Sequence, residues 1–142
     1  MAFLKEKKLD QLIPHLKQPV FGICLGMQLM CAYSEENDTT CMGIFDQQVK
    51  LFQPTNKQKV PHMGWNNISQ LNSGLFNKGL EDERVYFVHS YYAELSKYTA
   101  ATSDYCGQFS AALHKDNFYA TQFHPEKSGK IGANILENFI NL

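Results

Sequence analysis

The sequence predicts an α/β domain with a central, mostly parallel sheet and a smaller antiparallel β portion. Three observations predict this fold. A short apolar run at residues 20–23 passes directly into a helical pattern at 27–30. The region from about residue 42 to 123 contains several short β-like runs, and an amphipathic pattern at 130–140 closes the chain. Strands and helices mixed in this way are typical of the α/β classes.

Composition limits the possible functions. A chain of 142 residues fits one domain, so residues 1–142 are expected to form a single domain. The net charge of −1 gives no electrostatic argument for binding nucleic acid or an anionic membrane surface. The sequence has no apolar run long enough for a transmembrane helix, and its first residues lack the apolar region of a signal peptide. We therefore expect a cytoplasmic protein.

The four cysteines are at positions 24, 31, 41 and 106. No pair has C-x-x-C spacing, so neither a zinc ribbon nor a thioredoxin-like motif is indicated. An even number would allow two disulfides, but nothing else indicates secretion, and free thiols are expected. Cys31, Cys41 and Cys106 are interpreted as small buried or half-exposed residues.

The first third of the chain is predicted to contain two helical segments and one strand. Residues 2–17 have a helical pattern that is interrupted near Lys8 and Leu9 and bent or ended by Pro14. The strand at 20–23 follows, and the helix after it is expected to run to about Tyr33. A polar loop is predicted at 34–38.

The rest of the chain is predicted to be mainly strands. They are expected at residues 49–52, 84–89, 91–93, 99–102, 109–114 and 118–123, the last two forming a hairpin through 115–117. Residues 60–66 are interpreted as turn-rich, and a short helix is expected to begin at 74–76. The closing helix should place one apolar face on the core, formed by Ile131, Ile135, Leu136, Phe139 and Ile140.

Cys24 lies between two glycines in the pattern G-x-C-x-G, at residues 22–26. A strand that bends sharply into a helix, with the nucleophile at the bend, is the nucleophile elbow known for serine. Glycine suits such a bend because it has no Cβ and tolerates unusual backbone angles. A cysteine at a helix N-terminus is also favoured as a thiolate. The alternative is a buried structural cysteine at an ordinary strand-to-helix turn.

A second chemical segment is His124-Pro125-Glu126, at the end of a β-like run. An imidazole can take the proton of a thiol, and a carboxylate can orient that imidazole, while proline holds the turn between them. Three alternatives exist. The segment could be a surface strand end followed by a helix-capping Ser128. Zinc deaminases share the H-x-E pattern, but they need a P-C-x-x-C segment that is absent here. A protease-like Cys–His hydrolase would use the same pair.

Together, residues 22–28 and 124–126 resemble the class I, triad-type glutamine amidotransferases. His124 lies 100 residues after Cys24, and the two motifs in this order are far more specific than either alone. The resemblance implies a flavodoxin-like central sheet flanked by helices. It also implies an enzyme that hydrolyses the side-chain amide of glutamine through a glutamyl thioester and releases ammonia. No metal or organic cofactor is implied.

The resemblance also implies roles for individual residues. Cys24 is the expected nucleophile, His124 the general acid/base and Glu126 the residue that orients it. Gln28 is expected to bind the substrate, and the backbone N–H of Leu25 to donate to the oxyanion.

The segment P-H-M-G-W-N at 61–66 resembles the glutaminase subunits of imidazole glycerol phosphate synthases, which act in histidine biosynthesis. The implied partner is the TIM-barrel cyclase subunit, in a heterodimer, and the implied substrate is glutamine. Ser90 and Tyr91 would hold the α-amino and carboxylate groups of glutamine. The implied partner interface contains Trp65, Asn66, Tyr86 and Lys127.

Simpler interpretations remain for single residues. Trp65 is the only tryptophan, and a lone tryptophan is usually in the core, but beside a glycine and an asparagine in a turn it suits an interface anchor. His62 and His89 are more readily structural than catalytic. His15 and His114 have no motif around them.

The sequence departs from the family at its N-terminus. Members of the family are usually longer there and carry a P-G-x-G loop that supplies a second oxyanion N–H. We therefore expect an N-terminally truncated form, with the first strands, a helix and the P-G-x-G loop missing before Met1. Loss of one oxyanion donor typically costs ~10²–10³ in rate, so impaired or absent glutaminase activity is expected, with a tendency to associate.

Three other functions are compatible with the sequence. The chain could be a binding subunit that kept the interface but lost catalytic competence. It could be an amidotransferase subunit serving another synthase. It could also be a stand-alone cysteine hydrolase or protease, which would act without any partner.

Overall fold

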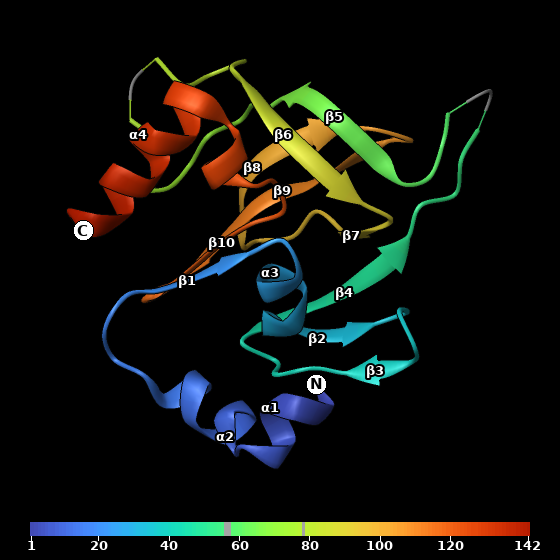
Figure 1. Ribbon diagram of the computed structural model, residues 1–142, viewed down its shortest axis with the longest axis vertical. Coiled ribbons are helices and arrows are strands. Elements are labelled where there is room, and N and C mark those ends of the chain that lie inside the picture. The colour runs from blue at the N-terminus through green and yellow to red at the C-terminus, as the bar shows by residue number, and fades with distance from the viewer. Residues whose placement is uncertain (56–57, 78) are drawn as a thin grey trace.

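The computed structural model describes residues 1–55, 58–77 and 79–142 and has an α/β fold (Figure 1). The helical segments are α1 (Ala2–Glu6), α2 (Leu9–Leu12), η1 (Ile13–His15), α3 (Leu25–Met30), η2 (Pro125–Lys127) and α4 (Gly129–Ile140). The strands are β1 (Val20–Ile23), β2 (Cys31–Ser34), β3 (Thr39–Thr40), β4 (Phe45–Leu51), β5 (His62–Asn67), β6 (Arg84–His89), β7 (Tyr91–Ala93), β8 (Thr99–Asp104), β9 (Gln108–Lys115) and β10 (Phe118–Thr121).

The main sheet has eight strands in the order β1-β10-β9-β7-β4-β2-β3, with β8 also paired to β9. The pairs β1–β10 and β2–β4 are parallel, and the other pairings in the described part of the chain are antiparallel. The α/β class is therefore confirmed, but the expected predominance of parallel strands is wrong. Several strands follow one another through short turns, and a short turn can join only antiparallel neighbours.

Several strands have the bounds that the sequence predicted, notably β1, β6 and β7. The predicted hairpin is also confirmed, because Phe118 of β10 pairs with Lys115 of β9 across the turn at 116–117. Asp116 adopts a positive φ of 53° there, a conformation that suits a tight hairpin turn. Its strand β10 ends at Thr121, two residues earlier than expected.

Three local predictions are wrong. Helix α3 ends at Met30 rather than near Tyr33, because the next residues form β2 and pair in parallel with β4. The segment interpreted as turn-rich forms strand β5, which pairs with β6 along its whole length. The helix expected from 74–76 is absent from the described residues there, where Phe76 N–H donates to the Ser73 carbonyl in a turn. In the first two cases pairing with a distant strand overrides the local pattern.

The helices at the N-terminus are interrupted where the sequence predicted. Lys8 has a left-handed φ of 57° between α1 and α2, and Pro14 lies in the single turn of η1. Helix α3 covers one side of the sheet, while α4 lies beside β6 (Figure 1). In the described residues, no helix is both long and apolar enough to span a bilayer.

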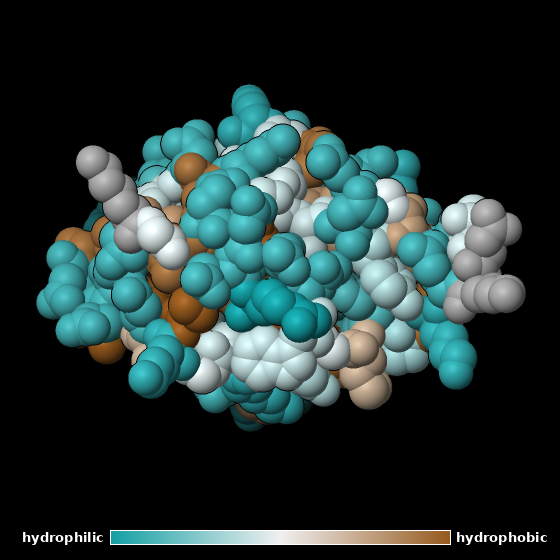
Figure 2. All heavy atoms as spheres, turned by 90° about the horizontal axis from the view of Figure 1, so that it is seen from above, coloured by the Kyte–Doolittle hydropathy of each residue, from teal (hydrophilic) through white to brown (hydrophobic). Residues whose placement is uncertain are grey.

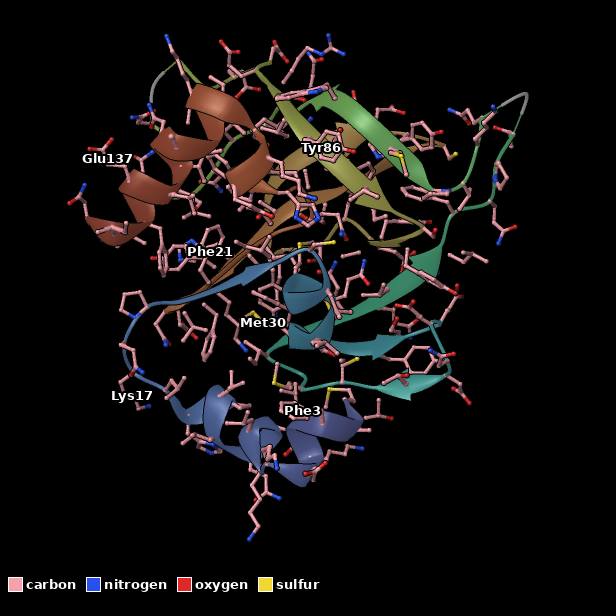
Figure 3. The ribbon with its side chains drawn as sticks, viewed as in Figure 1. Phe3, Lys17, Phe21, Met30, Tyr86 and Glu137 are labelled. Carbon is pink, nitrogen blue, oxygen red and sulfur yellow. The ribbon has the colours of Figure 1, made fainter. Side chains whose placement is uncertain are left out.

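The apolar core has two parts. One lies between the sheet, the β5–β6 pair and α4, and the other lies between α3 and the sheet. Helix α4 buries Ile135 completely and packs Phe139 against Phe21, with ring centroids 4.9 Å apart and ring planes inclined by 32°. Phe21 lies on β1 (Figure 3). Ile140 is 77% exposed, so its predicted place on the buried face is wrong. Ile140 is the last residue of the helix.

All four cysteines are free thiols. Cys31, the first residue of β2, is buried, and Cys41 and Cys106 are half-buried, which matches their interpretation as small core or half-exposed residues. Burial raises the pKa of Cys31 to about 12. Cys31 is therefore an inert packing residue, since the thiolate is the reactive form of cysteine.

Candidate active site

Cys24 lies at the bend between β1 and α3. Its backbone angles are φ 51° and ψ −105°, a conformation that residues other than glycine rarely adopt. A Cβ on Gly22 would lie 2.9 Å from the carbonyl carbon of Gly26, so strand and helix approach too closely for a side chain there. The bend therefore has the geometry of a nucleophile elbow, and only the first glycine is required by space.

The parallel pair β1–β10 brings the two sequence motifs together. Ile23 pairs with Thr121, and Cys24 N–H donates to the Thr121 carbonyl at 2.8 Å. Because the carboxyl ends of parallel strands meet at one edge of a sheet, Cys24 and Gln122 emerge side by side. His124 follows two residues later, at the same edge of the sheet.

The Cys24 thiol is protonated in its surroundings rather than poised as a thiolate. Burial, the largest effect, raises the pKa of Cys24, while hydrogen bonds from the Leu25 N–H and the Gln122 amide lower it. The negative charges of Glu126 and Glu36 raise it further. The thiolate expected from the helix N-terminus is therefore wrong for the free protein. Helix α3 has only six residues, and its dipole does not outweigh desolvation.

The thiol does not bond to the predicted base in this structure. Its Sγ atom lies 3.9 Å from the Val88 carbonyl oxygen, to which it donates. Within the described residues, no hydrogen bond joins Cys24 to His124. Catalytic hydrogen bonds often tighten only when substrate binds, so this arrangement is compatible with a later proton transfer.

His124 and Glu126 form a close pair. His124 Nδ1 lies 2.6 Å from Glu126 Oε1, and the Glu126 side chain is 47% exposed. A carboxylate only accepts, so Nδ1 carries the proton and Nε2 of the neutral ring is left with a free lone pair. The arrangement gives an oriented imidazole that can accept a proton at Nε2.

The turn that carries His124 is fixed by Ser128. Its hydroxyl donates to the His124 carbonyl at 2.6 Å and accepts from the Tyr86 N–H at 3.0 Å. His124 N–H in turn donates to the Tyr86 carbonyl at 2.9 Å. The helix-capping interpretation of Ser128 is therefore wrong, because its hydroxyl joins β6 to the turn. Gly132 of α4 lies directly on Pro125, where a Cβ would overlap the Pro125 carbonyl.

A pocket of about 430 Å³ opens at the elbow. It is lined by Cys24, Leu25, Gln28, Glu36, Pro61, Val88, His89, Ser90 and Tyr91. All the predicted nucleophile and substrate-binding residues are among them. Sequence reasoning missed Glu36 and Val88, because a loop glutamate and a strand valine carry no motif.

Two buried amides connect the pocket to the nucleophile. Gln28 Nε2 donates to the Tyr91 carbonyl at 3.0 Å and to Gln122 Oε1 at 2.9 Å. Gln122 is fully buried, and its Nε2 lies 3.7 Å from Cys24 Sγ. Sequence reasoning also missed Gln122. The available signal was a polar residue in an apolar strand, two positions before His124.

His62 and His89 are buried side chains that bond to each other, so their interpretation as structural histidines is confirmed. His89 also lines the pocket, and it donates from Nδ1 to the Tyr91 carbonyl at 2.8 Å. The described residues contain no cluster of three or more histidine, cysteine or acidic side chains that could hold a metal ion.

Three of the four residues predicted for a partner interface lie together at the β5–β6 pair. Trp65 pairs with Tyr86 across the two strands, with ring centroids 6.1 Å apart, and Lys127 Nζ lies 6.0 Å from the centroid of the Tyr86 ring. Trp65 is 48% exposed, so the core interpretation is wrong for it. Figure 3 shows Tyr86 on β6. We call Trp65, Tyr86 and Lys127 the aromatic patch.

Asn66 does not lie on the aromatic patch. Neighbouring residues of a strand point to opposite faces, and the Asn66 side chain donates inward to the Asp104 carbonyl at 2.9 Å. Seen from above, over β5 and β6, the surface is mostly hydrophilic with pale groups at its centre, and apolar groups gather toward α4 (Figure 2). A largely polar surface with an aromatic centre is typical of a specific protein interface.

A family match covers both the elbow and the turn at His124. Residues 4–142 match the model of the family "Glutamine amidotransferase class-I". The chain belongs to the class I glutamine amidotransferase family. The match extends over nearly the whole chain, so the family assignment does not rest on the two short motifs alone.

Curated relatives place this amidotransferase in the HisH-type branch of the family. A protein of Bacteroides fragilis (strain YCH46), named imidazole glycerol phosphate synthase subunit HisH, is 62% identical over the whole chain, which covers 73% of that protein. Proteins of the same name are 45% identical in Buchnera aphidicola and 48% identical in Shewanella sediminis, where the whole chain covers 73% and 67% of them.

Solved structures support the fold. A protein from Thermoplasma acidophilum, described as part of a putative GMP synthase, superposes with a TM-score of 0.69 at 23% identity, covering 94% of this chain and 61% of that one. A glutamine amidotransferase from Thermotoga maritima superposes with a TM-score of 0.62 at 19% identity, covering 99% and 55%. At these identities the likeness shows the amidotransferase fold alone.

Proposed function

We propose that this chain is the glutaminase subunit of an imidazole glycerol phosphate synthase, and that it hydrolyses glutamine and passes ammonia to a cyclase subunit in histidine biosynthesis. The observation that carries the proposal is the placement of Cys24 and the His124–Glu126 pair at the carboxyl ends of two adjacent parallel strands. The names of relatives up to 62% identical over the whole chain support the choice of synthase.

The first half of the reaction forms a thioester. Nε2 of His124 takes the thiol proton, and Cys24 Sγ attacks the side-chain amide carbon of glutamine. The negative charge that develops on the amide oxygen accepts a hydrogen bond from the Leu25 N–H. As the C–N bond breaks, His124 returns the proton to the leaving nitrogen and ammonia departs.

The second half releases glutamate. His124 takes a proton from water, the resulting hydroxide adds to the thioester carbon, and the C–S bond breaks to regenerate Cys24. Glu126 keeps Nδ1 protonated throughout and stabilises the imidazolium form. Gln28, Ser90 and Tyr91 line the pocket beside the thiol, where they are positioned to hold the glutamine backbone groups.

Ammonia needs a sheltered route to its acceptor. Near neutral pH free ammonia is mostly protonated and is then no nucleophile, so a glutaminase that serves a synthase gains from direct contact with it. The aromatic patch supplies a suitable contact, because tryptophan and tyrosine are enriched at the centres of interfaces. The cyclase subunit is therefore assigned to the β5–β6 side of the molecule.

The test combines labelling with turnover. The chain is incubated with an electrophilic glutamine analogue, with and without a cyclase subunit, and the modified peptide and glutamate release are measured. Labelling at Cys24 together with partner-stimulated glutamate release supports the proposal. Absence of labelling with intact cyclase binding would indicate a binding subunit instead. The proposal would be overturned if the rate of glutamate release did not change on addition of the cyclase subunit, or increased only with another synthase.

A further inference from the structure

The side-chain amide of Gln122 has one orientation open to it. The Tyr91 carbonyl can only accept, so the atom of Gln28 that faces it must be Nε2. The same Nε2 lies 2.9 Å from Gln122, so the facing atom of Gln122 must be the acceptor Oε1. The Gln122 NH₂ group is thereby turned toward Cys24, with Nε2 3.7 Å from Sγ. This orientation follows from bonding partners and not from an arbitrary choice of amide rotamer.

Besides the Gln122 amide, the Leu25 N–H is the group that lowers the pKa of the Cys24 thiol, and the other neighbours of the sulfur do not stabilise a negative charge. Its surroundings contain the carboxylates of Glu126 and Glu36, both of which raise the pKa of the thiol. The Val88 carbonyl next to it is an acceptor and repels a thiolate. The nearby histidines are His89, which is kept neutral by burial, and His124 in the turn after β10. A buried anion without donors is costly, so any N–H aimed at the sulfur matters.

We propose that Gln122 is a further catalytic residue, whose amide N–H stabilises the Cys24 thiolate both as nucleophile and as leaving group. The inference rests on the proposed function and deepens it. When Sγ loses its proton to His124, the weak neutral contact becomes a charge-assisted hydrogen bond. When the thioester is hydrolysed and the C–S bond breaks, the same N–H receives the departing thiolate. A neutral amide does this without adding a charge to the buried site.

Gln28 has a positioning part in this arrangement. By donating to both Oε1 of Gln122 and the Tyr91 carbonyl, it locks the direction of the Gln122 amide and ties the pocket wall to the nucleophile. Gln28 and Tyr91 line the pocket, so glutamine that binds there would contact residues that are linked by hydrogen bonds, through Gln122, to the thiol. Each hydrogen bond from Tyr91 through Gln28 to Gln122 therefore has a fixed direction. Gln28 Nε2 donates to the Tyr91 carbonyl and to Gln122 Oε1, and Gln122 Nε2 donates to Cys24 Sγ.

The experiment measures the pH dependence of Cys24 alkylation by iodoacetamide in the full chain, read from the Cys24 peptide by mass spectrometry. The Gln122→Met variant keeps the side-chain volume and removes the donor. In this variant we expect the midpoint of the pH profile of Cys24 alkylation to move upward by about one to two pH units. At neutral pH this corresponds to about a ten- to hundredfold lower rate of alkylation. Gln122→Glu places a carboxylate beside the sulfur and should move the midpoint further upward.

A matched control is Gln47→Met. Gln47 is also a buried glutamine that donates to a backbone carbonyl, that of Glu94 at 2.6 Å, but it lies outside the pocket. Its replacement should lower thermal stability and leave the Cys24 midpoint unchanged. A wild-type midpoint in Gln122→Met, or an equal shift in Gln47→Met, would overturn the inference. If Gln122→Met does not fold by circular dichroism, Gln122→Asn, whose shorter amide does not reach Sγ, is judged by the same midpoint.

The two proposals fail separately. If the wild-type chain is not labelled at Cys24 by the glutamine analogue, the proposed function fails. If it is labelled, and the midpoint of the folded Gln122 variants is unchanged, only the role of Gln122 fails.

Discussion

His62 Nδ1 lies 2.9 Å from His89 Nε2, where the two residues pair across β5 and β6. The direction of this bond follows from its surroundings. His89 Nδ1 faces the Tyr91 carbonyl at 2.8 Å, so it must carry the proton, and Nε2 of the neutral ring must accept. His62 therefore donates from Nδ1, and its Nε2 accepts from the Asn66 amide at 3.4 Å. Both rings are buried and neutral, and they support the backbone of the pocket wall.

This pair predicts an acid-sensitive stability. Burial lowers the pKa of His62 to about 4 and the pKa of His89 to about 3. The unfolded chain binds protons near pH 6.5, and the folded chain does not until far lower pH. The contribution is therefore fully present above about pH 6.5 and is lost as the pH falls toward 4. As the pH falls from 7 to 5, the free energy of unfolding should decrease by about 2 kcal/mol for each of the two histidines.

Guanidinium denaturation at several pH values in this range measures the loss. His15→Asn, at an exposed histidine, should retain the full pH dependence. The double variant with His62→Phe and His89→Met should have a flatter profile, since neither ring remains to be protonated. An unchanged slope in the double variant would contradict the assignment.

The two glycines of the elbow should respond oppositely to alanine. A Cβ on Gly22 would lie 2.9 Å from the backbone carbonyl carbon of Gly26, and neither strand nor helix can yield easily. Gly22→Ala is expected to destabilise the protein by about 1–3 kcal/mol. Around Gly26 the space is open, so Gly26→Ala should be neutral or stabilise helix α3 by about 0.5–1 kcal/mol. Chemical denaturation of both variants provides the measurement, and equal losses would refute the space argument.

His124 and Glu126 should contribute unequally to catalysis. Replacing His124 with alanine removes the proposed acid/base and should lower kcat for glutamine hydrolysis by about 10²–10⁴. Glu126→Gln should cost less, because the glutamate is 47% exposed and water can replace part of its contribution. The check is the kcat of each variant with the cyclase subunit present. A loss for Glu126→Gln as large as that for His124→Ala would show that the carboxylate is indispensable.

The aromatic patch should be the centre of partner binding. Trp65→Ala removes a half-exposed ring packed edge-on against Tyr86, and the affinity for the cyclase subunit should fall by about thirtyfold or more. The matched control is Phe3→Ala, an aromatic side chain that is 64% exposed on α1, far from Tyr86 in Figure 3. Titration calorimetry with purified cyclase subunit measures both. A larger loss for Phe3→Ala would place the interface elsewhere.

The parts of the site that were predictable are local. The pattern G-x-C-x-G predicts a sharp bend because Gly22 must lie against Gly26, and the bend forms within five neighbouring residues. The pair of His124 and Glu126 likewise needs only one turn of chain, held by Pro125. Strands β1 and β6 are predictable with their bounds because β-branched and aromatic residues concentrate there.

The parts that were not predictable depend on residues far apart in the chain. Helix α3 stops at Met30 because β4 offers a parallel partner to the next residues, and β5 is a strand because β6 pairs with it. The role proposed for Gln122 exists only because β10 lies beside β1. Burial raises the pKa of Cys24, and no residue next to Cys24 in the sequence indicates this burial.

The sequence by itself determined the family, the elbow and the His–Pro–Glu turn, since these are written in short contiguous segments with few backbone conformations open to them. Only the tertiary structure decided the mixed sheet, the direction of the amide chain to Cys24 and the protonated state of the thiol. Strand pairing and desolvation arise when distant segments exclude water together, so they are properties of the packed chain rather than of any stretch of it.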